Sequence, residues 1–385
     1  MPSMRTSLAP SFRRTTDTFT AGAKSLPQRY FVSPEIFTEE RKKIFSEQWV
    51  LVGHQNQIAR SGDYFISEVA GENLIVVRDK RSTIRAFYNV CRHRGTRLRE
   101  DQSGHASAIQ CPYHAWTYAL DGRLLGAPHM DDVSGFDKAD YSLHPVHLGL
   151  WEGFIFLNLA DKQQNASTER RGYIPLEECF APLAGKFLHW NLPALRSAKQ
   201  IEYDVRANWK LMFENYSECY HCPGVHPQLQ KISPYDSAEN DLAEGPFLGG
   251  FMKINQGKSL TMSGNACAAF VGKTENLQQV FYYSIFPNML LSLHPEYVMV
   301  HQLWPQSPDR TLIVCDWFFN PEAFERTDFH PNDAIEFWDM TNKQDWHVCE
   351  LSQQGIASRA YEPGPYSSRE TIPAAWDKYY LRQMR

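Results

Sequence analysis

The chain has 385 residues, of which 43% are hydrophobic and 22% are charged, and its formal net charge is −5. This length favours two domains over one simple core, and the acidic balance argues against a nucleic-acid-binding protein, which usually carries a basic face. The sequence contains no run of eighteen apolar residues, so we expect no segment that spans a membrane.

The N-terminal part of the chain is predicted to contain an arm and an all-β domain. Residues 1–48 are expected to form the arm and a short helix, over residues 34–48, that packs on the second domain. Residues 49–160 contain short alternating or apolar segments with turn residues between them, which predicts an all-β domain. Within it, Asp121-Gly122 is a strong hairpin signal.

Residues 161–385 are predicted to form the second domain, in which helices and strands mix. A strand is expected at 201–206, followed by a helix that Asn208 caps and Pro223-Gly224 ends. The other elements expected here are strands near 279–304 and 311–319 and a long helix from about residue 332 to 354. The predicted fold class is therefore α+β.

Two pairs of metal-ligating residues lie in the all-β domain. Cys91-Arg-His93 is followed, after seventeen residues, by Cys111-Pro-Tyr-His114. Two thiolates and two imidazoles are the donors of a Cys2His2 zinc site and of a Rieske [2Fe–2S] cluster, where two His replace two Cys on one iron. One Cys and one His in each loop favour the cluster, because structural zinc loops usually space their His residues more widely.

The use of cysteine indicates where the protein works. Four of the eight cysteines, Cys91, Cys111, Cys219 and Cys222, lie within or next to histidine motifs, which favours metal binding in a reducing compartment over a disulfide scaffold. The N-terminus also lacks the apolar run of a secretory signal. We therefore expect a cytoplasmic protein.

The first motif resembles a known family. C-R-H-R-G-T-R-L followed by C-P-Y-H-A-W-T-Y is similar to the Rieske motif of the Rieske non-haem iron oxygenases. This resemblance implies that residues 49–160 form a Rieske [2Fe–2S] domain. It also implies that Cys91 and Cys111 hold one iron of the cluster, and that His93 and His114 hold the other.

A second constellation, Glu218-x-x-His221-x4-His226, lies in the second domain. On a helix Glu218 and His221 would share a face, and two His with one carboxylate form the facial triad of Fe(II) oxygenases. The expected C-terminal helix offers the distant carboxylate. Asp345 lies in a largely apolar stripe, where an acid is costly unless a metal compensates it; Asp339 is the second candidate.

The stretch N-W-K-L-M-F-E-N-Y-S-E-C-Y-H-C-P-G-V-H-P resembles the catalytic helix of the same oxygenase family, and the acid of Q-D in F-W-D-M-T-N-K-Q-D-W-H-V-C-E resembles its third ligand. The resemblance implies that His221, His226 and Asp345 bind iron. It implies that Glu218 bridges to the Rieske His of a neighbouring subunit. Many members have Asp at this position, and Glu is shared by oxygenases of quaternary ammonium compounds. For Cys219-x-x-Cys222, packing is favoured over redox chemistry.

The resemblance extends from about residue 26 to the C-terminus and implies an α subunit with a helix-grip catalytic domain in a homotrimer. The chain has no G-x-G-x-x-G fingerprint after a strand. Electrons from NAD(P)H are therefore expected to come through a separate flavin/iron-sulfur reductase. O2 would be the co-substrate, and the iron would activate it.

The expected activity is hydroxylation of an N-methyl group of a betaine, which releases formaldehyde. Hydroxylation of an aromatic ring or acid is the alternative, and a non-catalytic Rieske electron carrier or a zinc-binding module is the alternative from a different class. A quaternary ammonium group requires an aromatic cage, whereas no residue stands out as the donor to a betaine carboxylate. The cage candidates are Phe281, Tyr282, Tyr283, Trp304 and Trp317.

Overall fold

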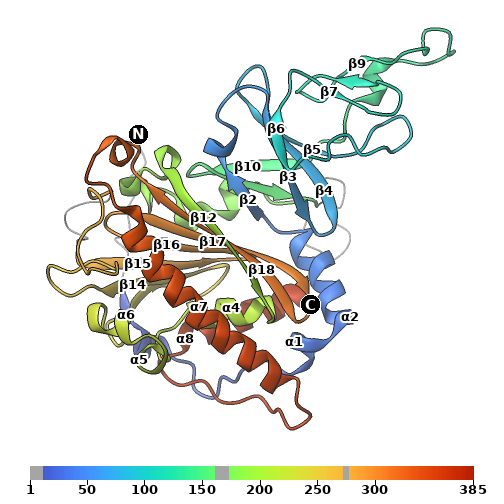
Figure 1. Ribbon diagram of the computed structural model, residues 1–385. Coiled ribbons are helices and arrows are strands. Elements are labelled where there is room, and N and C mark those ends of the chain that lie inside the picture. The colour runs from blue at the N-terminus through green and yellow to red at the C-terminus, as the bar shows by residue number, and fades with distance from the viewer. Residues whose placement is uncertain (1–11, 161–172, 272–276) are drawn as a thin grey trace, which may run out of the picture. The chain divides into compact units, whose positions relative to one another are not determined.

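The computed structural model describes residues 12–160, 173–271 and 277–385 (Figure 1). The described residues form two compact units. The small unit contains the described part of residues 41–186, and the large unit contains the described parts of residues 12–40 and 187–385.

The small unit is built from three antiparallel sheets with the strand orders β10-β11-β2, β5-β4-β3-β6 and β7-β8-β9. Asp121-Gly122 forms the expected turn between β8 and β9, and the φ of +90° at Gly122 explains why glycine stands there. The strands are β2 (Val50–His54), β3 (Asp63–Val69), β4 (Glu72–Arg78), β5 (Ile84–Tyr88), β6 (Ser103–His105), β7 (Ile109–Gln110), β8 (Thr117–Tyr118), β9 (Leu124–Gly126), β10 (His147–Trp151) and β11 (Phe154–Asn158).

The expected domain boundary at residue 161 is too early, because residues 173–186 belong to the small unit. Trp49 Nε1 donates a hydrogen bond of 2.9 Å to the carbonyl of Ile174. Helix α3 (Leu176–Cys179) packs on β10, where a Cβ on Gly149 would lie 2.5 Å from the Leu176 side chain. These contacts hold the segment against the small unit's sheet.

The large unit contains one eight-stranded antiparallel sheet with the order β1-β13-β14-β15-β16-β17-β18-β12 (Figure 1). The strands from β14 to β18 are mostly buried, as expected for a sheet that is covered, whereas β12 is largely polar and half exposed. The strands of this sheet are β1 (Arg13–Arg14), β12 (Arg196–Val205), β13 (Glu239–Leu242), β14 (Phe247–Lys253), β15 (Gln279–Ile285), β16 (Met289–Leu293), β17 (Val298–Ser307) and β18 (Arg310–Phe319).

Helix α7 (Pro331–Ile356), which contains the predicted long helix, packs against this sheet (Figure 1). Its Asp339 accepts a hydrogen bond of 3.0 Å from Tyr203 on β12, and its Asn342 contacts His301 on β17 at 3.2 Å. The structure thus confirms an α+β fold with a helix held against a large antiparallel sheet. The other helices are α1 (Arg29–Val32), α2 (Pro34–Glu40), α4 (Trp209–Tyr216), α5 (Cys222–Val225), α6 (Pro227–Ile232) and α8 (Thr371–Met384).

The helix predicted from Asn208 begins as expected but is shorter. The Asn208 side chain accepts a hydrogen bond from the Lys210 N–H at 3.1 Å, and α4 ends at Tyr216. Glu218 and His221 therefore lie in a turn and not on one helix face. Pro223-Gly224 belongs to α5, because proline fits the first turn of a helix as well as the residues beyond its end.

A buried ion pair fixes α4 in place. Lys210 Nζ lies 2.5 Å from Glu40 Oε1, and neither side chain is exposed. The indole N–H of Trp209 and the hydroxyl of Tyr380 on α8 also donate to Glu40. This network joins α2, α4 and α8, and α4 leads directly into the turn with Glu218 and His221.

Candidate metal centres

The two Cys/His loops of the small unit share one backbone design. Cys91 and Cys111 each donate their N–H to the carbonyl five residues later at 2.8 Å, and each accepts at its own carbonyl from the N–H four residues later. That fourth residue, Gly95 or Ala115, has a positive φ of 76° or 58°, which closes a tight turn. The two loops therefore share one backbone turn, in which the His is the third residue of the first loop and the fourth residue of the second.

The four predicted cluster ligands lie together. Cys91 and Cys111 are 3% exposed and form no disulfide, and the ring centroids of His93 and His114 are 4.8 Å apart. Burial raises the pKa of the Cys91 thiol, so a thiolate here needs a compensating cation. His114 Nδ1 is buried with no hydrogen-bond partner in the part of the chain that the structure describes. These four residues would hold a Rieske cluster.

Two aromatic residues that the sequence analysis did not single out surround these ligands. The Tyr118 hydroxyl lies 3.3 Å from Cys91 Sγ, and it accepts the N–H of Arg92 at 3.0 Å. The Trp116 ring stacks on His93 with a centroid distance of 4.8 Å and an interplanar angle of 9°. Hydrogen bonds to a ligating sulfur tune the reduction potential of a cluster. Both residues belong to the C-P-Y-H-A-W-T-Y stretch, so the resemblance of this stretch to the Rieske motif could have identified them.

The structure also brings His221, His226 and Asp345 together. Asp345 Oδ1 lies 2.7 Å from His226 Nε2 and 3.3 Å from His221 Nε2. Burial lowers the pKa of His221, but hydrogen bonds to Asp345 and Glu218 outweigh it and raise that pKa to about 10. A metal would displace this proton. Two imidazole nitrogens and one carboxylate oxygen that meet in this way fit the facial triad of an Fe(II) oxygenase.

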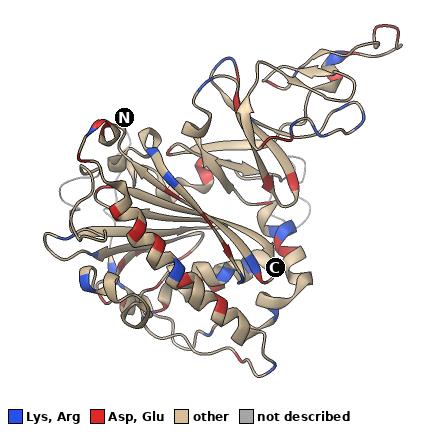
Figure 2. Cartoon of the chain, viewed as in Figure 1, with Lys and Arg blue, Asp and Glu red and all other residues tan. Residues whose placement is uncertain are grey.

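Acidic residues are spaced along the whole of α7 (Figure 2), so the geometry decides which of them reaches the histidines. Asp339 accepts from the Tyr203 hydroxyl at 3.0 Å and pairs with Lys343 at 2.6 Å. Its carboxylate is therefore engaged elsewhere, whereas Asp345 contacts both histidines. The helix-face argument selected the acid that the fold places at this site.

The remaining ring nitrogens of the two histidines are held by outer residues. Glu218 Oε1 lies 2.5 Å from His221 Nδ1, and Gln344 Oε1 lies 2.8 Å from His226 Nδ1. Because these oxygens accept, each Nδ1 carries the proton and each Nε2 is free to bind a metal. Gln344 was not predicted, although it precedes Asp345 in the Q-D pair.

Cys219 and Cys222 form a disulfide, so the prediction that they only pack was wrong. His221, Cys222 and His226 each offer an atom within 4.8 Å of one another. A disulfide sulfur is not a thiolate, however, and only the thiolate ligates metals well. Asp345 is therefore the better third donor.

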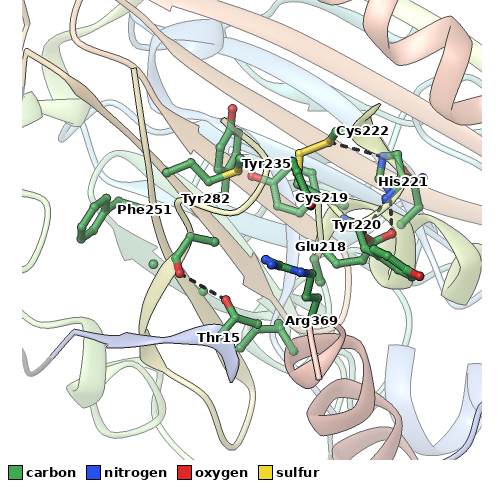
Figure 3. A pocket seen from close by; sticks show the side chains of 18 of the residues that line it. Thr15, Glu218, Cys219, Tyr220, His221, Cys222, Tyr235, Phe251, Tyr282 and Arg369 are labelled. Atoms are coloured by element: carbon green, nitrogen blue, oxygen red, sulfur yellow. Dashed lines mark hydrogen bonds and ion pairs between the residues drawn. A yellow bond between two sulfur atoms is a disulfide. The ribbon is translucent and has the colours of Figure 1, made fainter. Parts of the chain in front are cut away.

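A cavity of about 510 Å³ adjoins these residues (Figure 3). Of the predicted cage residues, Tyr282 lines it. Phe281, Tyr283, Trp304 and Trp317 are not among the described lining residues, so these four predictions were wrong. Side chains alternate along β15, and Phe281 and Tyr283 point away from the face of Tyr282. The aromatic side chains that line the cavity are Tyr216, Tyr220, Tyr235, Phe251, Tyr282, Trp338 and Trp346.

His301 adds a polar atom to this aromatic wall. It is 1% exposed, and burial lowers its pKa to about 4, so the ring is neutral. Nε2 lies 3.2 Å from Asn342 Oδ1, which accepts its proton, while Nδ1 has no partner among the described residues. His301 therefore offers a hydrogen-bond acceptor at the cavity.

Comparison with known proteins identifies the domain in which each candidate site lies. Residues 48–137 match the Rieske [2Fe-2S] domain, and residues 192–385 match the catalytic domain of the ring hydroxylating alpha subunit. The chain belongs to the Rieske-type ring-hydroxylating oxygenases. It is 32% identical to the glycine betaine monooxygenase oxygenase subunit of Chromohalobacter salexigens, over 90% of this chain and 82% of that protein.

Two further similarities concern carnitine enzymes. The carnitine monooxygenase oxygenase subunit of Escherichia coli K12 is 30% identical, over 88% of this chain and 86% of that protein. The crystal structure of the quaternary ammonium Rieske monooxygenase CntA with L-carnitine has a TM-score of 0.74 and 27% identity, and the match covers 94% of this chain and 95% of that one.

The chain is thus an oxygenase component, an O2-dependent oxidoreductase that uses a Rieske [2Fe–2S] cluster and a mononuclear iron. A separate reductase supplies its electrons. The electron-carrier and zinc-module interpretations are set aside, because the chain has both the Rieske domain and the catalytic domain. No helix among the described residues is long and apolar enough to cross a membrane.

Proposed function

We propose that the protein is a monooxygenase that hydroxylates an N-methyl carbon of a quaternary ammonium compound. The reaction takes O2, two electrons and two protons, and it yields the N-hydroxymethyl product and water. This product is a hemiaminal that collapses to the demethylated amine and formaldehyde. The names of the similar proteins and the Glu at position 218 support this class of substrate.

The observation that carries the proposal is an aromatic cavity beside the His221–His226–Asp345 group. Tyr282 contacts Tyr216 and Trp338 edge to face, with centroid distances of 5.8 and 6.4 Å. A quaternary ammonium group donates no hydrogen bonds, and aromatic faces attract it through their negative π-surfaces. An N-methyl carbon bound here would lie next to the candidate iron ligands.

The residues of the chain have separable tasks in this reaction. When bound, the iron supplies the chemistry of O2 activation. His221, His226 and Asp345 would hold it, while Glu218 and Gln344 fix the two imidazole rings. The aromatic wall binds the substrate and keeps bulk water out, which limits side reactions.

We further propose a homotrimer in the cytoplasm in which the cluster of one subunit serves the iron of the next. Glu218 would connect the two centres, because its carboxylate already holds His221. The reductase would be a flavin/iron-sulfur protein that takes electrons from NAD(P)H. A head-to-tail ring of this kind closes a heterologous interface.

Metal analysis followed by a substrate panel tests the proposal. Protein purified anaerobically should contain about three irons and two acid-labile sulfides per chain, with a rhombic EPR signal after reduction. With a reductase, glycine betaine, carnitine or choline should give formaldehyde in proportion to the substrate consumed. Zinc in place of iron would contradict the proposal. Hydroxylation of aromatic acids, without formaldehyde from any quaternary ammonium compound, would favour the ring-hydroxylating alternative.

A further inference from the structure

The cavity contains an arginine side chain that takes no part in the candidate metal site. Arg369 lines it, and its guanidinium points into the middle of the cavity, between Thr15 and the turn of Glu218 (Figure 3). It lies 5.1 Å above the Tyr235 ring. Among the described residues, no carboxylate forms an ion pair with Arg369, and its guanidinium makes no hydrogen bond. A half-buried arginine is thus held in the cavity without an anion.

The backbone around Arg369 is fixed. The Arg369 N–H donates to Ser367 Oγ at 3.2 Å, and the Ser367 N–H donates to Glu370 Oε2 at 2.7 Å. Thr371, the first residue of α8, donates its hydroxyl to the carbonyl of Thr15 at 2.9 Å. The turn that carries Arg369 is therefore positioned before any ligand arrives, which reduces the entropic cost of binding.

The other charges of the cavity do not neutralise this guanidinium. Glu218 and Asp345 are engaged by the histidines. The remaining charged groups on the cavity wall are Asp236, Glu239, Arg14 and Lys253, and none of them pairs with Arg369. A substrate with only a positive charge would be repelled by Arg369, whereas a substrate with a carboxylate would match its planar fork of donors.

We propose that Arg369 binds the carboxylate of the substrate, so that the enzyme prefers a zwitterionic betaine to a cationic amino alcohol. This inference rests on the proposed function and narrows its substrate class. The aromatic wall of Tyr216, Tyr282 and Trp338 receives the quaternary ammonium group, and Arg369 receives the anionic end. Arg369 is thus a specificity-determining residue.

Glycine betaine and choline are matched probes, because both contain a trimethylammonium group and only glycine betaine has a carboxylate. Titration calorimetry of the oxidised holoenzyme, without a reductase, measures binding with no turnover. Wild-type protein should bind glycine betaine more tightly than choline. Arg369→Gln should weaken the binding of glycine betaine by about 10- to 100-fold, the range for a lost charge-assisted hydrogen bond. It should leave choline binding unchanged or strengthen it.

Two further variants sharpen the test. Arg369→Lys keeps the charge but loses the planar fork of donors. Its affinity for glycine betaine should lie between those of wild type and Arg369→Gln. Arg359→Gln removes an exposed arginine that does not line the cavity, and should bind both probes as wild type does. The Rieske absorption spectrum and the iron content of each variant report that it has folded.

The outcomes separate the two proposals. Wild-type protein that binds glycine betaine, with an Arg369→Gln variant that binds it equally well, would refute the role of Arg369 alone. Wild-type protein that binds choline as tightly as glycine betaine would also overturn the inference. Protein that binds neither of these compounds nor carnitine would contradict the proposed function, and this inference with it.

Discussion

At the scale of single residues, each imidazole of the candidate iron site uses its two nitrogens differently. Nδ1 of His221 is held by Glu218 and Nδ1 of His226 by Gln344, while both Nε2 atoms face Asp345. Oxygen acceptors on Nδ1 fix the tautomer and the ring orientation, which metal sites in proteins commonly require. The two rings are therefore prepared for a metal before it binds.

The acid on α7 gives the most direct test of this site. Asp345→Ala should lose the mononuclear iron and keep the cluster, so that the iron content falls from about three to about two per chain. Iron analysis and the Rieske EPR signal measure the two centres separately. Asp339→Ala is the matched control on the same helix and should keep both centres. Loss of the mononuclear iron in Asp339→Ala would show that the wrong acid has been assigned.

At the scale of elements, α4 depends on buried charge. Lys210 and Glu40 are both fully buried and lie 2.5 Å apart. Lys210→Met leaves the Glu40 carboxylate buried without its cation and should destabilise the protein by about 3–5 kcal/mol. Denaturant unfolding measures the change.

The control for this prediction is an exposed ion pair. Lys343 pairs with Asp339 at 2.6 Å, but the Lys343 side chain is 65% exposed. Lys343→Met should therefore cost less than about 1 kcal/mol. Equal effects of the two lysine variants would contradict the structural role of the buried pair.

The contact of α4 with α8 should make stability depend on pH. Burial raises the pKa of Asp377 to about 7, although the Tyr366 hydroxyl, 2.7 Å away, lowers it. Burial and the Asp377 carboxylate also raise the pKa of Glu214 well above its usual value. Both folded pKa values lie above those of the unfolded chain, so the protonated acids favour folding. The contribution of Asp377 is complete below its ordinary pKa of 3.8 and is lost as the pH rises through about 7.

Asp377→Asn removes one of these acids and should flatten this dependence. Urea unfolding at pH 5 and pH 8 compares the two proteins, and each proton released contributes at most about 1.4 kcal/mol per pH unit. An equal slope for wild type and Asp377→Asn would show that this acid is already ionised in the folded protein.

Some elements were predictable because their pattern is local. Helix α7 was predicted to within a few residues from its apolar stripe, and the same stripe selected Asp345. The cavity residues were not predictable in this way. Residues 280–283 of β15 are all apolar or aromatic. No alternation of polar and apolar residues therefore shows which face of this strand lines the cavity. Helix α8, the position of Arg369 in the cavity and the contacts of the Glu40 carboxylate depend on tertiary structure, which no local pattern reports.

At the scale of the whole molecule, the cluster ligands and the iron ligands belong to separate compact units. Electron transfer between the subunits of a trimer can be tested with trimers that contain two different variants. Glu218→Gln interrupts the bridge but keeps the cluster, and His93→Ala loses the cluster but keeps Glu218. Each variant alone should lose most of its activity. Co-expressed chains should recover part of it, because the cluster of one variant can serve the iron of the other.

Formaldehyde release by tagged and co-purified mixed trimers measures this recovery. Separately purified variants that are combined only in the assay are the control, because each variant has then been assembled only with itself. Mixed trimers without activity would exclude electron transfer between subunits. Full activity of Glu218→Gln alone would exclude the bridge role of this residue.

The disulfide between Cys219 and Cys222 closes a small ring around His221 and begins one residue after Glu218. Thiol reagents that are routine in protein purification reduce disulfides, and Cys219 is the more accessible partner here, since Cys222 is 2% exposed. Where such a reagent reduces this bond, samples prepared with and without it differ chemically at the ligand loop, even when their sequence and metal loading are the same. Activities are therefore comparable only between samples in which these two sulfur atoms have the same oxidation state.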